Sequence, residues 1–206
     1  MQLNKEIKSI IKLIPSMVLS AMLVGVSVNL YVNACFGCDS ISILEDGIHN
    51  TFNVSLGTAA YIYGFITLIL GYILGRKYIS LVSVANTFLC GPFINAFGVL
   101  FENINANTMI IRIIMFIFAI LTTALGCAIL IYKGCGTSTL DAIVQGISDK
   151  TIFEYKLVRT LTDIALFIIG IILKGQFGIG SIIAALLTGT VINYLVKLLN
   201  KTKGTC

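Results

Sequence analysis

Six long apolar runs dominate the chain, and they restrict it to folds that cross a lipid bilayer. Each run approaches the length of about 20 residues that an α-helix needs to span the hydrocarbon core. Only 11% of the 206 residues are charged, against about 25% in an average soluble domain. The sequence therefore predicts an all-α membrane protein with six transmembrane helices, at about 11–33, 56–75, 78–100, 109–132, 157–173 and 179–199.

Lysines and arginines lie in short clusters beside these runs, and they predict how the helices are oriented. With six crossings, Arg112 and Lys174 fall near one side of the membrane and the remaining basic residues fall on the other. The positive-inside rule then places both termini in the cytoplasm, with the chain in the cytoplasmic (cell) membrane. Although the net charge is +5, basic residues arranged in this way indicate topology and not nucleic-acid binding.

Internal similarity divides the chain into a first repeat, residues 1–105, and a second repeat, residues 106–206. Residues 83–95 match residues 181–193, with Ser, Gly, Ile and Asn recurring in register. Because each half holds three expected crossings, the second half enters the membrane from the opposite side, which predicts two inverted three-helix repeats in one membrane domain. If the short segments described next also crossed the membrane, the repeats would be parallel, but their length disfavours this.

One short segment with small and hydroxyl residues interrupts the apolar sequence in each half. The two segments cover residues 35–49 and 133–148. Aligning Gly37 with Gly136 also aligns Gly47 with Gly146 without a gap. Each segment can cap a helix that is too short to span the bilayer, so we expect half-helices or re-entrant segments whose N–H groups favour an anion or carboxylate. The alternative is that both are amphipathic helices lying on the membrane surface.

Ionisable residues near the expected spans are the other candidates for a site, because burying charge in a membrane is costly. Arg159 and Asp163 lie four residues apart, on one helix face where they can pair, and Asp141 lies in the second short segment. Arg159 has the alternative of snorkelling to the interface. The predicted solute-binding residues are Gly37, Cys38, Asp39, Ser40, Gly136, Thr137, Ser138, Thr139, Asp141, Arg159 and Asp163.

The residues that could support catalysis or metal binding do not form a recognisable pattern. Cys35 and Cys38 form the one Cys-x-x-Cys pair, and no second pair or nearby histidine completes a tetrahedral metal site. Cys90 and Cys127 lie in apolar runs, where a thiol behaves as a small hydrophobic group. We therefore expect mostly free structural thiols, no metal, no cofactor and no enzymatic activity.

The two halves share a glycine-rich pattern with a known family. The second half reads Gly126, Gly136-Thr-Ser-Thr-Leu-Asp141, Arg159, Gly178-Ile-Gly-Ser181 and Gly189-Thr190. The first half reads Ser27, Gly37-Cys-Asp-Ser-Ile-Ser42, Ser80-Leu-Val-Ser83 and Gly91-Pro92. Over nearly its whole length the chain resembles the YczE/YitT-like family of bacterial integral membrane proteins, and it is closer to the YczE branch. Ser40 and Thr139 stand where the family often has proline, and Ser42 replaces the first-half aspartate, which puts a symmetrical two-acid site in doubt.

These observations favour a transporter, and the resemblance implies the same presumed role without a substrate. We expect the bilayer and a small polar or anionic solute as partners, with the solute bound at the midplane between the inverted repeats. The alternative is a substrate-binding or accessory membrane subunit that acts with a partner protein. A homodimer is a further open arrangement. A channel of aquaporin-like design ranks third, because the chain contains no Asn-Pro-Ala pair.

Overall fold

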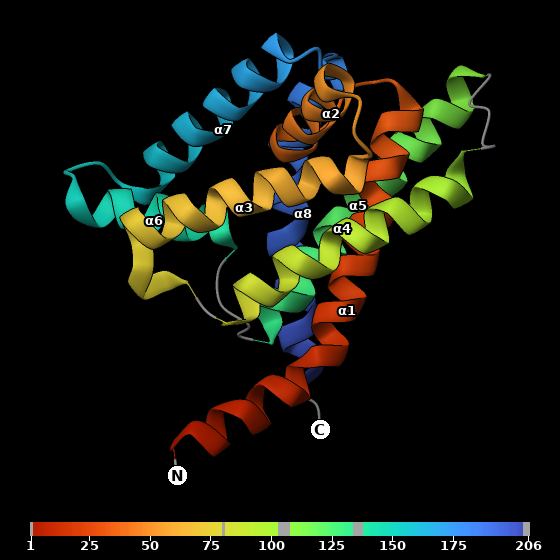
Figure 1. The fold of residues 1–206 in the computed structure, drawn as a ribbon. Coiled ribbons are helices and arrows are strands. Elements are labelled where there is room, and N and C mark those ends of the chain that lie inside the picture. The colour runs from red at the N-terminus through yellow and green to blue at the C-terminus, as the bar shows by residue number, and fades with distance from the viewer. Residues whose placement is uncertain (1, 80, 103–107, 134–137, 204–206) are drawn as a thin grey trace.

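The computed structural model describes residues 2–79, 81–102, 108–133 and 138–203, and these residues form helices and connecting turns without a strand (Figure 1). The first half contains α1 (Gln2–Ala34), α2 (Ser40–Phe52), α3 (Leu56–Gly75), the short 3-10 helix η1 (Arg76–Tyr78) and α4 (Leu81–Phe101). The second half contains α5 (Met109–Tyr132), α6 (Thr139–Lys150), α7 (Tyr155–Ile172) and α8 (Ile179–Lys203). The all-helical prediction is confirmed for the described part of the chain.

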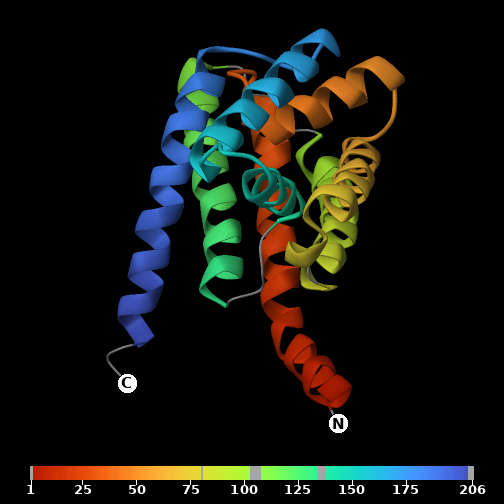
Figure 2. The same cartoon turned by 90° about the vertical axis from the view of Figure 1, so that its left-hand side faces the viewer.

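Five of the helices are long and apolar enough to cross a membrane: α1 from Leu13 onward, α3, α4, α5 and α8. The sixth expected span corresponds to α7, which has 18 residues and is not among the helices that are apolar enough to cross a membrane. The reason is its charge, because Lys156, Arg159 and Asp163 all lie within it. Figures 1 and 2 show α7 beside α2 at the upper end of the molecule, whereas α1, α5 and α8 run along its length.

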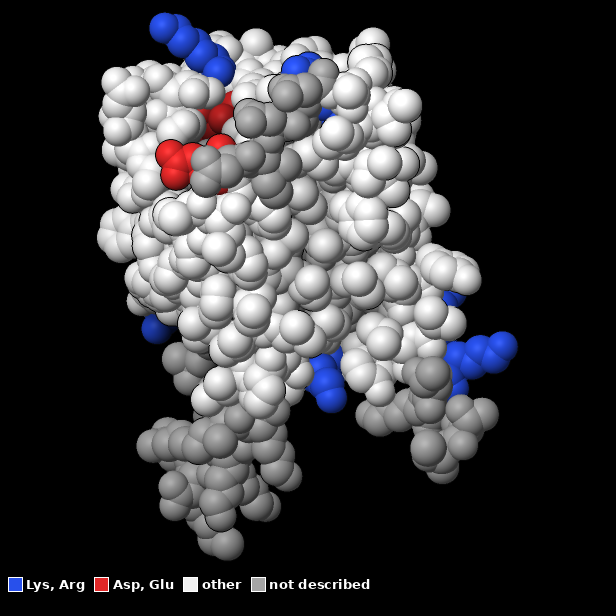
Figure 3. Space-filling model, turned by 90° about the vertical axis from the view of Figure 1, so that its right-hand side faces the viewer, with Lys and Arg blue, Asp and Glu red and all other residues white. Residues whose placement is uncertain are grey.

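The outer surface is apolar over a broad band, as contact with hydrocarbon requires. Large side chains remain exposed on several helices, including Phe65 at 60%, Ile110 at 70% and Leu186 at 71%. On the face in Figure 3 the charged groups gather towards the two ends, with a largely uncharged region between them. An exposed apolar surface of this size is far larger than soluble monomers carry. The described helices therefore have the surface of a membrane protein.

The two short helices pack reciprocally between the halves. Helix α2 packs mainly against α7, and α6 packs mainly against α3. Around them α1 contacts α5 and α4, while α5 contacts α8. Every residue of α2 from Ser42 to Ile48 is buried, which covers nearly two turns and therefore all sides of the helix. This segment of α2 lies inside the protein, whereas a surface helix would leave one face open.

Glycines allow both short helices to approach their partners closely. A Cβ atom added to Gly47 would lie 2.8 Å from the carbonyl oxygen of Gly170 on α7. A Cβ atom added to Gly146 would collide with the carbonyl oxygen of Leu74 on α3 and lie 2.5 Å from the Cα atom of Gly75. Of the two glycines that the sequence alignment pairs, Gly47 thus lies where α2 meets α7, and Gly146 lies where α6 meets α3.

Candidate functional site

A cavity of about 400 Å³ lies between the short helices, and helices α1 to α7 all contribute to its wall. Its wall is mainly apolar, with Val24, Ile94 and Leu130 among the lining residues. The start of α6, from Ser138 to Asp141, forms part of the wall, as do Ile41 and Glu45 of α2. Both short helices thus reach one cavity, and its volume is within the usual range for a small-molecule site.

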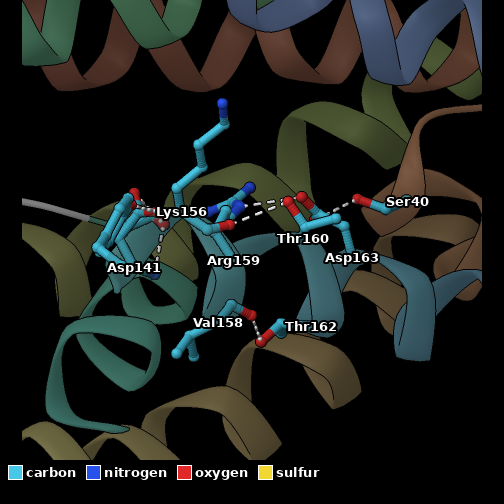
Figure 4. A network of polar contacts seen from close by, with 10 residues as sticks. Ser40, Asp141, Lys156, Val158, Arg159, Thr160, Thr162 and Asp163 are labelled. Atoms are coloured by element: carbon cyan, nitrogen blue, oxygen red, sulfur yellow. Dashed lines mark hydrogen bonds and ion pairs between the residues drawn. The ribbon is translucent and has the colours of Figure 1, made fainter. Parts of the chain in front are cut away.

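Arg159 on α7 holds two aspartates beside this cavity (Figure 4). Its Nη1 atom pairs with Oδ1 of Asp141, and its Nε atom lies 3.1 Å from Oδ2 of Asp163. The predicted pairing of Arg159 with Asp163 across one helical turn is therefore confirmed. Lys156, on the first turn of the same helix, extends away from these carboxylates. One guanidinium thus faces two carboxylates, so its positive charge is fully compensated.

Hydroxyl groups complete this network and connect it to both short helices. Ser40, the first residue of α2, donates to Oδ1 of Asp163 at 2.8 Å. Ser138 donates to Oδ2 of Asp141 at 2.9 Å and accepts from the Asp141 N–H, which makes it the cap of α6. Tyr155 donates to Oδ1 of Asp141 at 3.0 Å. The network therefore fixes the N-terminal ends of α2 and α6 to one face of α7.

Of the remaining predicted site residues, Thr139 lies at the cavity, and the others lie elsewhere or outside the described residues. Gly37 has a φ of +103°, and a Cβ atom there would collide with Oγ of Ser181 on α8, so this glycine serves the turn between α1 and α2. Cys38 is buried in an apolar cluster that includes Phe116, and neither it nor Asp39 lines the cavity. Thr139 does line the cavity, and its hydroxyl lies 3.0 Å from that of Thr67. Gly136 and Thr137 lie outside the described residues.

Several polar residues outside the predicted set also line the cavity, and Glu45, Tyr63 and Asn86 are three of them. Glu45 is only 6% exposed. Within the described part of the chain, its Oε2 atom, the Tyr63 hydroxyl and the Asn86 Oδ1 atom are buried without a hydrogen-bond partner. In the neighbouring Asp46, the Oδ2 atom accepts from the Gln176 N–H at 2.7 Å, while Oδ1 is also buried without a partner among the described residues. The sequence signal for Glu45 was an acid in the middle of a short, otherwise largely apolar segment.

The environment of Glu45 favours its protonated form. Burial, and to a lesser extent the charge of Asp39, raises the pKa of the Glu45 carboxyl to about 8. Because this folded-state pKa lies above the unfolded value of about 4.3, the folded protein holds the proton more tightly than the unfolded chain. The resulting contribution to stability is full below about pH 4 and is lost as the pH rises through 8.

Replacing Glu45 by glutamine is expected to remove this dependence on pH. Between pH 6 and 9, the free energy of unfolding of the wild type should fall by about 2.7 kcal/mol relative to Glu45→Gln. This corresponds to a melting midpoint about 5–11 °C lower. Thermal melts of the detergent-purified protein at each pH measure the difference. Glu154→Gln makes the same change at an exposed residue and is the control. Parallel curves for wild type and Glu45→Gln would contradict the assignment.

Comparison with known proteins gives relatives without an assigned activity. The model of a family of unknown function, DUF6198, matches residues 11–197. The uncharacterized protein YyaS of Bacillus subtilis (strain 168) is 23% identical over 184 residues, which are 87% of this chain and 90% of YyaS. The uncharacterized membrane protein YczE of the same organism is 24% identical over 145 residues, 69% of this chain and 66% of YczE. No solved structure gives a significant match. The match to YczE confirms the resemblance to the YczE branch and agrees with the apolar helices.

Proposed function

We propose that this membrane protein, which belongs to the DUF6198 family of unknown function, transports a small polar solute. The observation that carries the proposal is the cavity of about 400 Å³, which both short helices reach from opposite halves of the chain. In a bilayer, buried polar backbone is tolerated where it is packed in protein or lines a wet cavity. Short helices that meet at such a cavity are typical of solute sites in transporters.

The reciprocal packing supports an inverted-repeat design with residues 1–105 and 106–206 as its halves. In such a design the two short helices are equivalent, and so are α3 and α7. The contacts of α2 with α7 and of α6 with α3 fit this equivalence, as do the crossings at Gly47 and Gly146. In this arrangement α7 is the sixth span, and the compensated charge of Arg159 makes its burial tolerable. Alternating exposure of the cavity would come from rocking the halves against each other.

The charges around the cavity favour a polar solute over an anionic one. Among the described residues that line it, the acidic side chains are Glu45 and Asp141, and there is no lysine, arginine or histidine. Arg159 is engaged by two aspartates, so it offers little attraction to an incoming anion. Serine, threonine and asparagine side chains on α4 and α6 offer hydrogen bonds instead. The N-terminus of α6 is also occupied, because Ser138 accepts from the Asp141 N–H there.

We propose that both termini face the cytoplasm. Helix α1 begins and α8 ends at the same end of the molecule (Figure 2), which is compatible with an even number of crossings. Most of the basic residues fall on that side in the six-span arrangement, as the positive-inside rule requires.

Thiol labelling tests whether the cavity is open to water. Ile41→Cys and Leu140→Cys, placed singly in a cysteine-free chain, put a reporter on each short helix in the cavity wall. In sided membrane vesicles, a membrane-impermeant methanethiosulfonate reagent is expected to label both at least about tenfold faster than Leu186→Cys. The control side chain is 71% exposed on α8 and faces hydrocarbon in a membrane, where the reagent does not enter. If both cavity cysteines resist labelling from either side, the transport proposal fails.

A further inference from the structure

We propose that Glu45, Tyr63 and Asn86 form the head-group site of this cavity, and that they bind the ammonium group of an amine with an apolar body. The bound amine displaces the proton of Glu45. This inference rests on the proposed function, because it names the class of solute that the cavity takes.

Three buried polar atoms without partners carry the inference. Oε2 of Glu45, the hydroxyl of Tyr63 and Oδ1 of Asn86 come from α2, α3 and α4, and all three residues line the cavity. Buried polar atoms are nearly always hydrogen-bonded, and an unsatisfied one is costly. Two of these atoms are acceptors and the hydroxyl can act as one. An ammonium group supplies three donors and a positive charge, so it matches this set of oxygens.

Among the residues that the structure describes, no lysine or arginine pairs with Glu45 to neutralise it once it loses its proton. Among the described residues that line the cavity there is no lysine, arginine or histidine. The titratable groups around it are Cys38, Asp39, Asp46 and His49 on its own segment, Tyr63 on α3, Cys90 on α4, Cys127 on α5, Asp141 on α6, and Tyr155, Arg159 and Asp163 on α7. Of the two basic side chains in this set, Arg159 is already paired with two aspartates, and His49 contacts the carbonyl oxygen of Val54 through Nδ1. Glu45 therefore holds either a proton or an external cation.

The other side chains of the cavity wall indicate what kind of molecular body the ammonium group is attached to. Ala60, Ile94, Leu130 and Leu140 surround the cavity, and such side chains bind apolar groups and give no hydrogen bonds. A volume of about 400 Å³ lies towards the small end of ligand sites. A compact aliphatic or aromatic amine fits this mainly apolar wall better than a sugar does, because a sugar needs more hydrogen bonds than the few serine, threonine and asparagine side chains of the wall offer.

The exchange is balanced in charge and protons. The resting site holds Glu45 as a neutral carboxylic acid. When an ammonium ion enters, the carboxyl O–H bond breaks, the proton leaves to the solvent, and the carboxylate pairs with the ammonium. One positive charge thus replaces another. Transport of the amine in one direction is therefore coupled to transport of a proton in the other.

Calorimetric titration of the full detergent-purified chain tests this with three probes that share one apolar body. The probes are phenethylammonium, phenethyl alcohol and 3-phenylpropionate. At pH 7 we expect phenethylammonium to bind at least about tenfold more tightly than either of the others. Titrations in two buffers of different ionisation enthalpy should show about one proton released per ammonium bound. Because protons compete for Glu45, whose pKa is raised to about 8, affinity should rise about tenfold from pH 6 to pH 7.

Matched variants assign the effect to one carboxyl. Glu45→Gln is expected to lose tenfold or more in ammonium affinity and to abolish proton release, while alcohol binding persists. Asp46→Asn, on the same helix but outside the cavity wall, should bind as the wild type does. Tighter binding of phenylpropionate, or unchanged ammonium binding by a folded Glu45→Gln protein, would overturn the inference. A lack of proton release when the wild type binds phenethylammonium would also overturn the inference, and this measurement does not depend on any variant. If none of the probes binds while the cavity cysteines label readily, this inference fails and the transport proposal stands.

Discussion

Replacing Arg159 by methionine is expected to lower the free energy of unfolding by about 3 kcal/mol and the melting midpoint by about 6–12 °C. Removing the guanidinium leaves Asp141 and Asp163 without their counter-charge and removes the ion pair that joins the start of α6 to α7. This expected loss of stability lies at the lower end of the range for a broken buried ion pair. The reason is that the side chains of Arg159, Asp141 and Asp163 remain 31%, 26% and 29% exposed. Thermal unfolding in detergent measures the loss.

A second set of variants separates charge from packing at this position. Lys156→Met removes a positive charge from the same helix, where the side chain extends away from the network, and it should shift the midpoint by less than about 2 °C. Arg159→Lys should recover part of the loss, because an ammonium cannot make the forked contacts of a guanidinium. The triple variant with Asp141→Asn, Arg159→Met and Asp163→Asn should recover more, since it leaves no unpaired charge. If Arg159→Met is as stable as Lys156→Met, the ion pairs of Arg159 do not stabilise the fold.

The parts of this network that are local in sequence were predictable. Arg159 and Asp163 pair because residues four apart share a helix face, and Ser138 caps α6 because hydroxyl residues cap helix starts. A short helix in each half also followed from the interrupted apolar pattern. Five of the six predicted spans correspond to helices that are long and apolar enough to cross a membrane. The exception is α7, because three charged residues lie within its 18 residues.

The parts that depend on distant contacts were not predictable. The glycine turn at Gly37 was predicted as part of the site, but it packs against Ser181. Its neighbours Cys38 and Asp39 do not line the cavity. Glu45 was not predicted, because its position in the cavity depends on how α2 packs against α7 and α3. Periodicity indicates which residues share a helix face. It does not indicate which neighbour covers that face when both sides of the helix are buried.

The crossing of α3 and α6 gives the other large expected effect. Gly146→Ala is expected to destabilise the protein by about 3 kcal/mol, because the added methyl group would collide with the Leu74 carbonyl oxygen and approach the Gly75 Cα atom. These neighbours are backbone atoms, so no side-chain rotation relieves the clash. In an open helix the same change would instead stabilise by up to about 1 kcal/mol.

Gly189 on α8 provides the control with the opposite sign, because a Cβ atom there would meet nothing within 4 Å. Gly189→Ala should therefore raise the melting midpoint by up to about 2–4 °C, whereas Gly146→Ala should lower it by about 6–12 °C. A cavity that depends on this close crossing should also change, so Gly146→Ala should alter the labelling rate of Leu140→Cys, which lies on the same helix. Equal midpoints for the two glycine variants would mean that α6 does not approach α3 this closely. Opposite shifts would establish the backbone contact that holds the second short helix against the first half of the chain.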